Sequence, residues 1–143
     1  FKEESIYIPP NPINNDYDNK VEMFIRNHPD GSSYIAGDCY TFANDFTKYI
    51  YGKTVEQGIR YDKTYTADEI RNGDVVHVFG TATKNPHYFV VLRRNGNSLE
   101  TIEGNWPHGK VTYSKTAYTI VNGQLYRGNE KPFRTWDGGY HYQ

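Results

Sequence analysis

Helical and strand-like patterns occupy different halves of this 143-residue chain. Two segments before residue 53 place apolar residues at the spacing of three and four that one face of a helix requires, and after residue 53 this period fades. The later part alternates short apolar runs with turn signals. Helices first and antiparallel strands afterwards predict an α+β fold, not a wound α/β sheet, and the length fits one domain.

Both helices are marked at their ends. We expect the first to run from Asp16 to a stop at Pro29, and the second from the N-cap residue Asp38 to a stop at Gly52. Residues 29–37 form the loop between them. The apolar stripe of the second helix, which we expect to face the core, consists of Cys39, Phe42, Ala43, Phe46 and Ile50.

The second half of the chain carries the signals of an antiparallel meander. Asn-Gly pairs at residues 95–96 and 122–123 separate strand-like runs, and this pair is the strongest short hairpin signal. We expect strands over residues 74–79, 87–93, 98–105, 110–113 and 117–121.

The start of the chain differs from the rest. Residues 1–15 include three prolines and show no helical period, so we expect an extended arm or a linker remnant there, followed by a single domain over 16–143. The given sequence begins at Phe1 without an initiator Met, a basic n-region or an apolar h-region. We therefore interpret the sequence as a trimmed mature form or an excised piece of a longer protein.

Charge and composition narrow the classes of partner. Lys and Arg number 16 against 17 Asp and Glu, and a net charge of −1 argues against nucleic-acid binding, which needs a basic face. Apolar runs are far shorter than the roughly 20 residues of a membrane-spanning helix, so we expect no membrane span. Aromatic residues make up 16% of the chain, which is typical of a folded domain and not of a disordered segment.

Cys39, the only cysteine, is the first candidate for chemistry. We expect it in the first turn of the second helix, where unpaired backbone N–H groups and the positive end of the helix dipole favour the thiolate that attacks a carbonyl carbon. Free cysteines are also often buried as small apolar residues, and the apolar stripe agrees with that alternative. The helix alone leaves both interpretations open.

A nucleophilic cysteine needs a base, and His87 is the best placed of the five histidines. It begins a strand-like run, where a side chain can face a cleft and the core at once. His77 is compatible with a position in the core. The other three, His28, His108 and His141, are compatible with roles at a helix end, in a loop and near a terminus.

Two polar residues on the next strand are candidates to orient this base. Glu103 and Asn105 point to one face because side chains alternate along a strand. A polar group on that face can hold the second ring nitrogen of His87 and fix its tautomer. Taken alone, the segment is equally compatible with a strand-ending turn at Gly104-Asn105 and a solvated Glu103.

Together these segments resemble the papain-like cell-wall hydrolases, most closely the CHAP family (cysteine, histidine-dependent amidohydrolase/peptidase) and its NlpC-type relatives. The resemblance covers residues 37 to about 113 in the family's order: a Cys-bearing helix, a Gly-Asp-Val-Val strand at 73–76, a His-headed strand and Glu-x-Asn-Trp at 103–106. Asp38 before the cysteine is similar to the NlpC branch, whereas residues 103–106 are similar to CHAP, so the branch and the bond cleaved stay open. No segment matches the calcium-binding loop of some CHAP domains, and we assign neither a metal nor a cofactor.

The resemblance implies a papain-like α+β fold, with the cysteine at a helix N-terminus packed on an antiparallel sheet. It implies Cys39 as nucleophile, His87 as base, Glu103 as the group that orients the imidazole and Asn105 as a further polar member of the site. We expect amide hydrolysis through an acyl-enzyme, most plausibly in bacterial peptidoglycan peptide, by a monomer that is secreted or cell-wall associated. The residues expected near the substrate, each also compatible with a packing role, are Tyr34, Tyr40, Tyr88 and Trp106.

Two rival interpretations stay open. The same fold and triad are compatible with a secreted effector, or with a non-wall substrate such as a protein glutamine or a thioester. Alternatively, Cys39 is buried, and the 14 Tyr, 7 Phe and 2 Trp side chains form the sugar-stacking surface of a non-catalytic, wall-binding module.

A further expectation concerns the hairpin between His87 and Asn105. Because side chains alternate, His87 shares a face with Glu103 only if the numbers of paired residues add up to an even value. A two-residue turn at residues 95–96 gives an odd value. We therefore expect a three-residue loop over residues 95–97, or an equivalent one-residue bulge, because either gives an even value.

Overall fold

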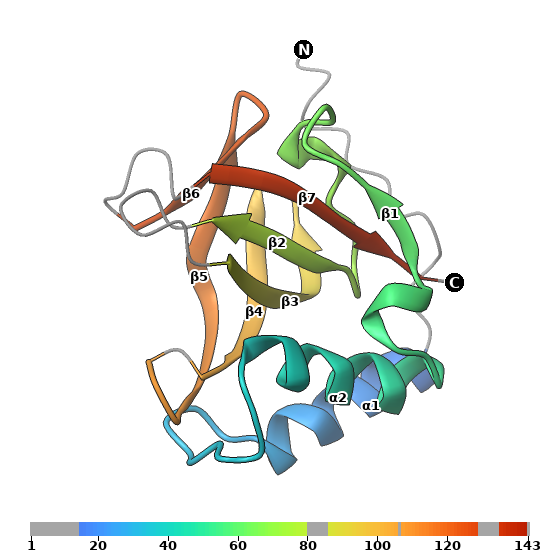
Figure 1. Ribbon diagram of the computed structural model, residues 1–143, viewed down its shortest axis with the longest axis vertical. Coiled ribbons are helices and arrows are strands. Elements are labelled where there is room, and N and C mark those ends of the chain that lie inside the picture. The colour runs from blue at the N-terminus through green and yellow to red at the C-terminus, as the bar shows by residue number, and fades with distance from the viewer. Residues whose placement is uncertain (1–14, 80–85, 106, 129–134, 143) are drawn as a thin grey trace.

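The computed structural model describes residues 15–79, 86–105, 107–128 and 135–142. In this part of the chain, two α-helices pack against a seven-stranded antiparallel sheet that curls on itself (Figure 1). The predicted α+β class is therefore confirmed. The arm expected over residues 1–15 lies outside the described residues, except that Asn15 already belongs to the first helix.

The sheet is built from a meander and one inserted strand. Its strands are β1 (Ile59–Tyr61), β2 (Val75–Phe79), β3 (Pro86–Asn95), β4 (Ser98–Gly104), β5 (Val111–Val121), β6 (Gln124–Arg127) and β7 (Thr135–His141). Their order is β1-β7-β2-β3-β4-β5-β6, and all neighbouring pairs are antiparallel. The predicted strands correspond to β2 through β5, with the last two joined in the single strand β5, and β7 lies between β1 and β2.

The two helices, α1 (Asn15–Asn27) and α2 (Cys39–Tyr51), lie close to the predicted bounds, and capping side chains and backbone fix the ends of α2. The Asp38 side chain accepts a hydrogen bond from the backbone N–H of Thr41 at 2.9 Å, so that it caps α2. At the other end Gly52 adopts the left-handed conformation (φ 68°) and ends the helix. No helix of the described residues is long and apolar enough to span a bilayer.

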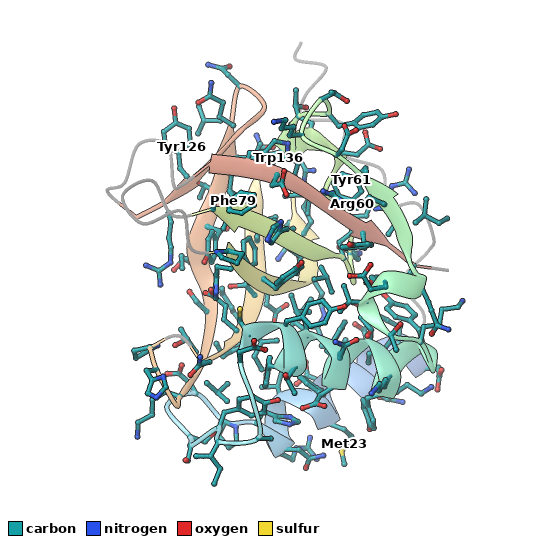
Figure 2. The ribbon with its side chains drawn as sticks, in the orientation of Figure 1. Met23, Arg60, Tyr61, Phe79, Tyr126 and Trp136 are labelled. Carbon is teal, nitrogen blue, oxygen red and sulfur yellow. The ribbon has the colours of Figure 1, made fainter. Side chains whose placement is uncertain are left out.

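Apolar side chains are buried on both faces of the sheet. The helices cover one face, and the curl of the sheet closes over the other (Figure 1). On α1 the side chain of Met23 instead projects away from the sheet (Figure 2). The helix-side cluster includes Val21, Phe24, Phe42, Phe46, Val90, Leu92 and Ile102, and the inner cluster includes Ile70, Val76, Phe89, Leu99, Tyr118 and Ile120.

The hairpin of β3 and β4 has an irregular register. Its turn consists of two residues, 96–97, so the expected three-residue loop is wrong. A bulge between Val91 and Arg93 then shifts the ladder by one residue, which is the other form of the expectation. Beyond the bulge Val90 pairs with Ile102, and these numbers add up to an even value. The register expected at the site end of the hairpin is therefore confirmed.

Contacts on both sides of the bulge explain this register. Leu92 is buried in the helix-side cluster, while Arg93 reaches α1 and forms ion pairs with Asp18 (3.1 Å) and Glu22 (2.7 Å). Nearer the turn, the buried side chain of Arg94 donates from Nε to the carbonyl of Gly96 at 2.6 Å. The bulge lets the chain satisfy both the tight turn and the helix contacts.

Several tyrosines pack with the ring in the core and the hydroxyl on a distant backbone carbonyl. Tyr17 donates to Leu92 O (2.5 Å), and Tyr142 donates to Val55 O (2.8 Å). Each contact joins segments far apart in the sequence. A buried tyrosine needs such a partner. These tyrosines therefore stabilise the fold by joining distant segments.

Helix α2 lies very close to β4 at Gly104. A Cβ atom at this position would come within 2.2 Å of Cγ of Phe42. Only glycine allows this approach, which explains why a glycine interrupts the strand pattern between Glu103 and Asn105. The contact sets the distance between the first turn of α2 and the end of β4.

Candidate active site

Cys39 is the first residue of α2 and is half-buried against the start of β3. Its Sγ accepts a hydrogen bond from the backbone N–H of Tyr88 at 3.5 Å. The thiol therefore lies at the start of a central strand, and Cys39 does not belong to the helix-side cluster. Its backbone N–H belongs to the first helical turn, whose N–H groups have no acceptor within the helix.

His87 joins the cysteine to a carboxylate. Its Nε2 donates to Glu103 Oε1 at 2.6 Å, and both side chains are almost fully buried. A side-chain hydrogen bond also connects His87 to Cys39. Because Nε2 is bound to Glu103, Nδ1 is the ring nitrogen that remains for the sulfur. The structure thus brings together the three residues that the sequence selected from α2, β3 and β4.

The electrostatics of this cluster favour a charged thiolate and imidazolium. Burial acts to raise the pKa of the Cys39 thiol, but the His87 hydrogen bond, the Tyr88 N–H and the histidine's charge outweigh it, so the pKa falls below its ordinary value. Burial acts to lower the pKa of His87, whereas its bonds to Cys39 and Glu103 raise it above the ordinary value. Because the thiol pKa is lowered and the imidazole pKa is raised, thiolate and imidazolium coexist over a wider pH range.

A fourth residue, Tyr118 of β5, completes the buried cluster. Its hydroxyl donates to the same carboxylate oxygen, Glu103 Oε1, at 2.8 Å. The ring is fully buried and stacks on Phe89 with centroids 4.2 Å apart. Sequence reasoning missed this residue. Thr112 is the residue that pairs with Glu103 in the ladder, so Tyr118 reaches the carboxylate diagonally through the inside of the curled sheet.

Asn105 follows β4 in the left-handed conformation (φ 60°). Its Oδ1 accepts a hydrogen bond from the backbone N–H of Gly109 at 2.7 Å, so this oxygen shapes the turn after the strand. The residue also lines a pocket beside Asp38, the neighbour of Cys39 in the chain. Its part in the chemistry stays a prediction.

The pocket beside Asp38 has a volume of about 340 Å³, and Asp38, the neighbour of Cys39 in the chain, forms part of its wall. Tyr34 forms part of its wall and is mostly buried, with the hydroxyl donating to Asp45 Oδ2 at 2.9 Å. The residues that line the pocket are Tyr34, Ile35, Gly37, Asp38, Asn105, His108 and Gly109.

Two of the other expected substrate residues lie together at Cys39. The rings of Tyr40 and Tyr88 meet edge to face with centroids 4.9 Å apart, and Tyr40 donates to Glu56 Oε2 at 3.0 Å. Both side chains remain partly exposed. Trp106, the fourth expected substrate residue, lies outside the described residues.

His77, a buried residue, pairs with the half-buried Asp137. Its Nδ1 lies 2.7 Å from Asp137 Oδ2, because a bulge in β7 places Asp137 and Gly138 opposite His77. Arg60, which lies beside β7 in Figure 2, also approaches Asp137, at 3.5 Å. The His77 ring stacks on Tyr88 at 4.3 Å, behind the Tyr40–Tyr88 pair.

The three remaining histidines lie outside the contacts between Cys39, His87 and Glu103. His141 lies 2.7 Å from the buried carboxylate of Asp74, and His28 donates to the carbonyl of Phe24 at 2.9 Å. His108 is exposed in the turn after β4. Within the described ranges, no group of three or more His, Cys, Asp or Glu is placed to hold a metal ion.

Comparisons of this chain with protein-family models, with curated proteins and with solved structures found no match.

Proposed function

We propose that this protein is a cysteine hydrolase of papain-like architecture that cleaves an amide bond through an acyl-enzyme. The observation that carries the proposal is that one buried histidine, His87, contacts both the thiol of Cys39 and the carboxylate of Glu103. Burying ionisable groups costs free energy that a packing role does not require. Such groups with shifted pKa values beside a pocket are typical of a catalytic site.

In the first half of the proposed reaction the Cys39 thiolate attacks the carbonyl carbon of the amide. A C–S bond forms, and the C=O electron pair moves to the oxygen, where the backbone N–H of Cys39 donates a hydrogen bond. When the oxyanion collapses, the C–N bond breaks. His87 gives its Nδ1 proton to the leaving nitrogen, so that an amine departs and a thioester remains.

In the second half neutral His87 takes a proton from water, and the hydroxide attacks the thioester carbon. The C–S bond breaks, the electron pair returns to the sulfur, and the product leaves as a carboxylic acid. Glu103 holds the Nε2–H of His87 throughout, which keeps Nδ1 directed at the thiol and stabilises the imidazolium.

We propose peptidoglycan peptide as the substrate, and therefore a secreted or wall-associated protein. The support is the ordered resemblance of residues 37 to about 113 to the CHAP and NlpC-type hydrolases. The position of Cys39, between the pocket beside Asp38 and the tyrosines Tyr40 and Tyr88, suits an extended peptide that passes the thiol. The same chemistry is also compatible with an effector or with a non-wall amide substrate. The absence of released peptidoglycan fragments in the experiment below would favour these alternatives.

The sugar-stacking alternative has less support. A wall-binding module needs aromatic side chains on its surface, but within the described part of the chain only Tyr49 and Tyr65 are exposed aromatic residues. The other described tyrosines and phenylalanines are buried or half-buried, and several carry hydroxyl contacts within the fold.

Digestion of purified peptidoglycan tests the proposal. The wild type should release fragments whose new amine and carboxyl ends, read by mass spectrometry, identify the bond, and Cys39→Ser should release none. Iodoacetamide should alkylate wild-type Cys39 rapidly at about pH 6 to 7, where an ordinary thiol reacts slowly. A protein with neither activity nor a reactive thiol would disprove the hydrolase proposal.

A further inference from the structure

A chain of side-chain contacts crosses four neighbouring strands of the sheet. It runs from His87 on β3 to Glu103 on β4, then to Tyr118 on β5 and to Arg127 on β6. Arg127 pairs directly with Tyr118 in the β5–β6 ladder, and its guanidinium carbon lies 5.5 Å from the centroid of the Tyr118 ring. The contacts connect the edge strand of the sheet to Cys39.

We propose that Tyr118 and Arg127 are positioning residues, which hold the Glu103 carboxylate in the orientation that His87 requires. This inference rests on the proposed function, because it assigns the two residues to the base of the same site. Neither residue belongs to the segments that carry the family resemblance.

Glu103 needs a second anchor for a physical reason. Its side chain has three rotatable bonds, so a single contact with His87 does not fix the carboxylate. Oε1 accepts from both His87 and Tyr118, whereas Oε2 has no hydrogen-bond partner among the described residues. Without the tyrosine, the buried carboxylate would retain one of these two bonds and could turn Oε2 towards His87.

Tyr118 is suited to this task. Its ring is held by stacking on Phe89, with an interplanar angle of 12°. Burial, together with the charge of Glu103, raises the pKa of the Tyr118 hydroxyl well above its ordinary value, so the group remains a donor at every working pH. It can therefore hold the carboxylate without exchanging a proton with it.

Arg127 supports the tyrosine from the edge strand. It contributes a side-chain hydrogen bond to Tyr118 and a positive charge over the face of the ring. That charge offsets part of the cost of burying Glu103. We expect its effect on the site to have the same direction as that of Tyr118 and a smaller size, because it acts through the tyrosine.

Several charged groups around His87 influence the pKa values of the Cys39–His87 pair. Cys39 and Glu103 face His87 directly, and His77 on β2 and Asp38 before α2 interact with this pair over a longer distance. A change at Tyr118 leaves all four in place. A shifted titration in a Tyr118 variant would therefore report on the orientation of Glu103.

The chain offers a matched control. Tyr113, on the same strand, also donates its hydroxyl to a glutamate of β4, in this case Glu100. Glu100 binds Arg93 and not a histidine. Tyr113→Phe removes the same kind of hydrogen bond and should cost stability, but it leaves the base untouched.

The experiment measures the rate of Cys39 alkylation by iodoacetamide against pH, beside unfolding in urea, for Tyr118→Phe, Arg127→Met and Tyr113→Phe. A hydrogen bond to a charged group corresponds to about a tenfold effect. We expect Tyr118→Phe to lower the rate at about pH 6 by roughly this factor, through a higher thiol pKa, with rates that converge at alkaline pH. Arg127→Met should shift the profile less in the same direction, and Tyr113→Phe should keep the wild-type profile.

The outcomes separate this inference from the function on which it rests. A wild type without rapid alkylation at about pH 6 removes the proposed thiolate site itself. A reactive wild type, with equal profiles for Tyr118→Phe and Tyr113→Phe, overturns the positioning role alone, as does a thiol pKa lowered by Tyr118→Phe. If Tyr118→Phe does not fold, Arg127→Met decides: a wild-type profile overturns the proposal, and a shift to higher pH supports it.

Discussion

Phe42 of helix α2 lies directly over Gly104 of β4, so closely that a methyl group at residue 104 would overlap the aromatic ring. The helix begins three residues before Phe42 with Cys39, and the strand holds Glu103 next to Gly104. One packing contact therefore sets the separation between Cys39, the proposed nucleophile, and Glu103, the carboxylate proposed to orient its base. This contact offers a way to disturb the site without changing any of its polar groups.

Gly104→Ala should force α2 away from β4. We expect a loss of stability of about 1 to 3 kcal/mol, as for other overpacked cores, together with slower alkylation of Cys39 at about pH 6 because His87 no longer reaches the thiol. Urea unfolding and iodoacetamide kinetics measure the two effects. The double variant Phe42→Leu, Gly104→Ala should recover part of both. Additive losses in the double variant would contradict the packing explanation.

His87→Ala should reduce turnover as severely as Cys39→Ala, because residues that act as one unit fail together. His77→Ala is the matched control, since it removes another buried histidine that is bound to a carboxylate on this sheet. We expect it to cost stability but to retain measurable turnover. Steady-state kinetics of the two variants check this. If His77→Ala abolished turnover and His87→Ala did not, His87 would be the wrong choice of base.

Cys39→Ala should abolish turnover and leave the thermal midpoint within a few degrees of the wild type. The reason is that the thiol is half-buried at the start of β3, outside the helix-side cluster, and contributes little packing. Calorimetry checks this expectation. A loss of about 2 to 5 kcal/mol, typical of truncation in a core, would favour the purely structural cysteine instead.

Asp74 should make stability depend on pH. Burial raises the pKa of this carboxyl to about 6, even though His141, the Arg71 N–H and Tyr61 all bind it. The protonated form is therefore favoured by folding, so its contribution is complete below about pH 4 and is lost as the pH rises to about 6. Relative to Asp74→Asn, the wild type should lose on the order of 3 kcal/mol across this range.

Urea unfolding of the wild type and Asp74→Asn at several pH values between about 4 and 7 tests this expectation. Asp62→Asn is a suitable control, because Asp62 is an exposed carboxylate held by Thr64 in a local turn. A stability difference between wild type and Asp74→Asn that stays constant, or grows with pH, would show that Asp74 remains ionised in the folded protein.

The helices follow from local signals in the sequence. Asp38 and Gly52 mark the ends of α2 through their own backbone and side-chain preferences, which require no tertiary contact. The last strand gives no comparable signal, because Asp137, Gly138 and Gly139 interrupt it at a bulge. Strand β5 carries a polar stretch at residues 114–116, and for this reason the sequence predicts two short strands where there is one.

The same distinction applies to the site. Cys39, His87 and Glu103 are predictable because a helix start and strand alternation determine where each side chain points. The bulge between Val91 and Arg93 is predictable only as a requirement of that arrangement, since no local pattern marks it. Tyr118 is not predictable, because its contact with Glu103 depends on how far the whole sheet curls.

The chain of contacts across β3 to β6 also has a consequence for the order in which the site forms during folding. His87, Glu103, Tyr118 and Arg127 all lie on β3 to β6, which short hairpins connect, whereas Cys39 comes from a helix that is synthesised earlier. Contacts between consecutive strands form readily, but docking α2 onto β4 needs a more distant encounter. Until that encounter the cysteine has no histidine beside it, and its thiol has ordinary reactivity. The lowered pKa of the Cys39 thiol therefore depends on completion of the fold, because it needs His87 and the Tyr88 N–H beside the sulfur.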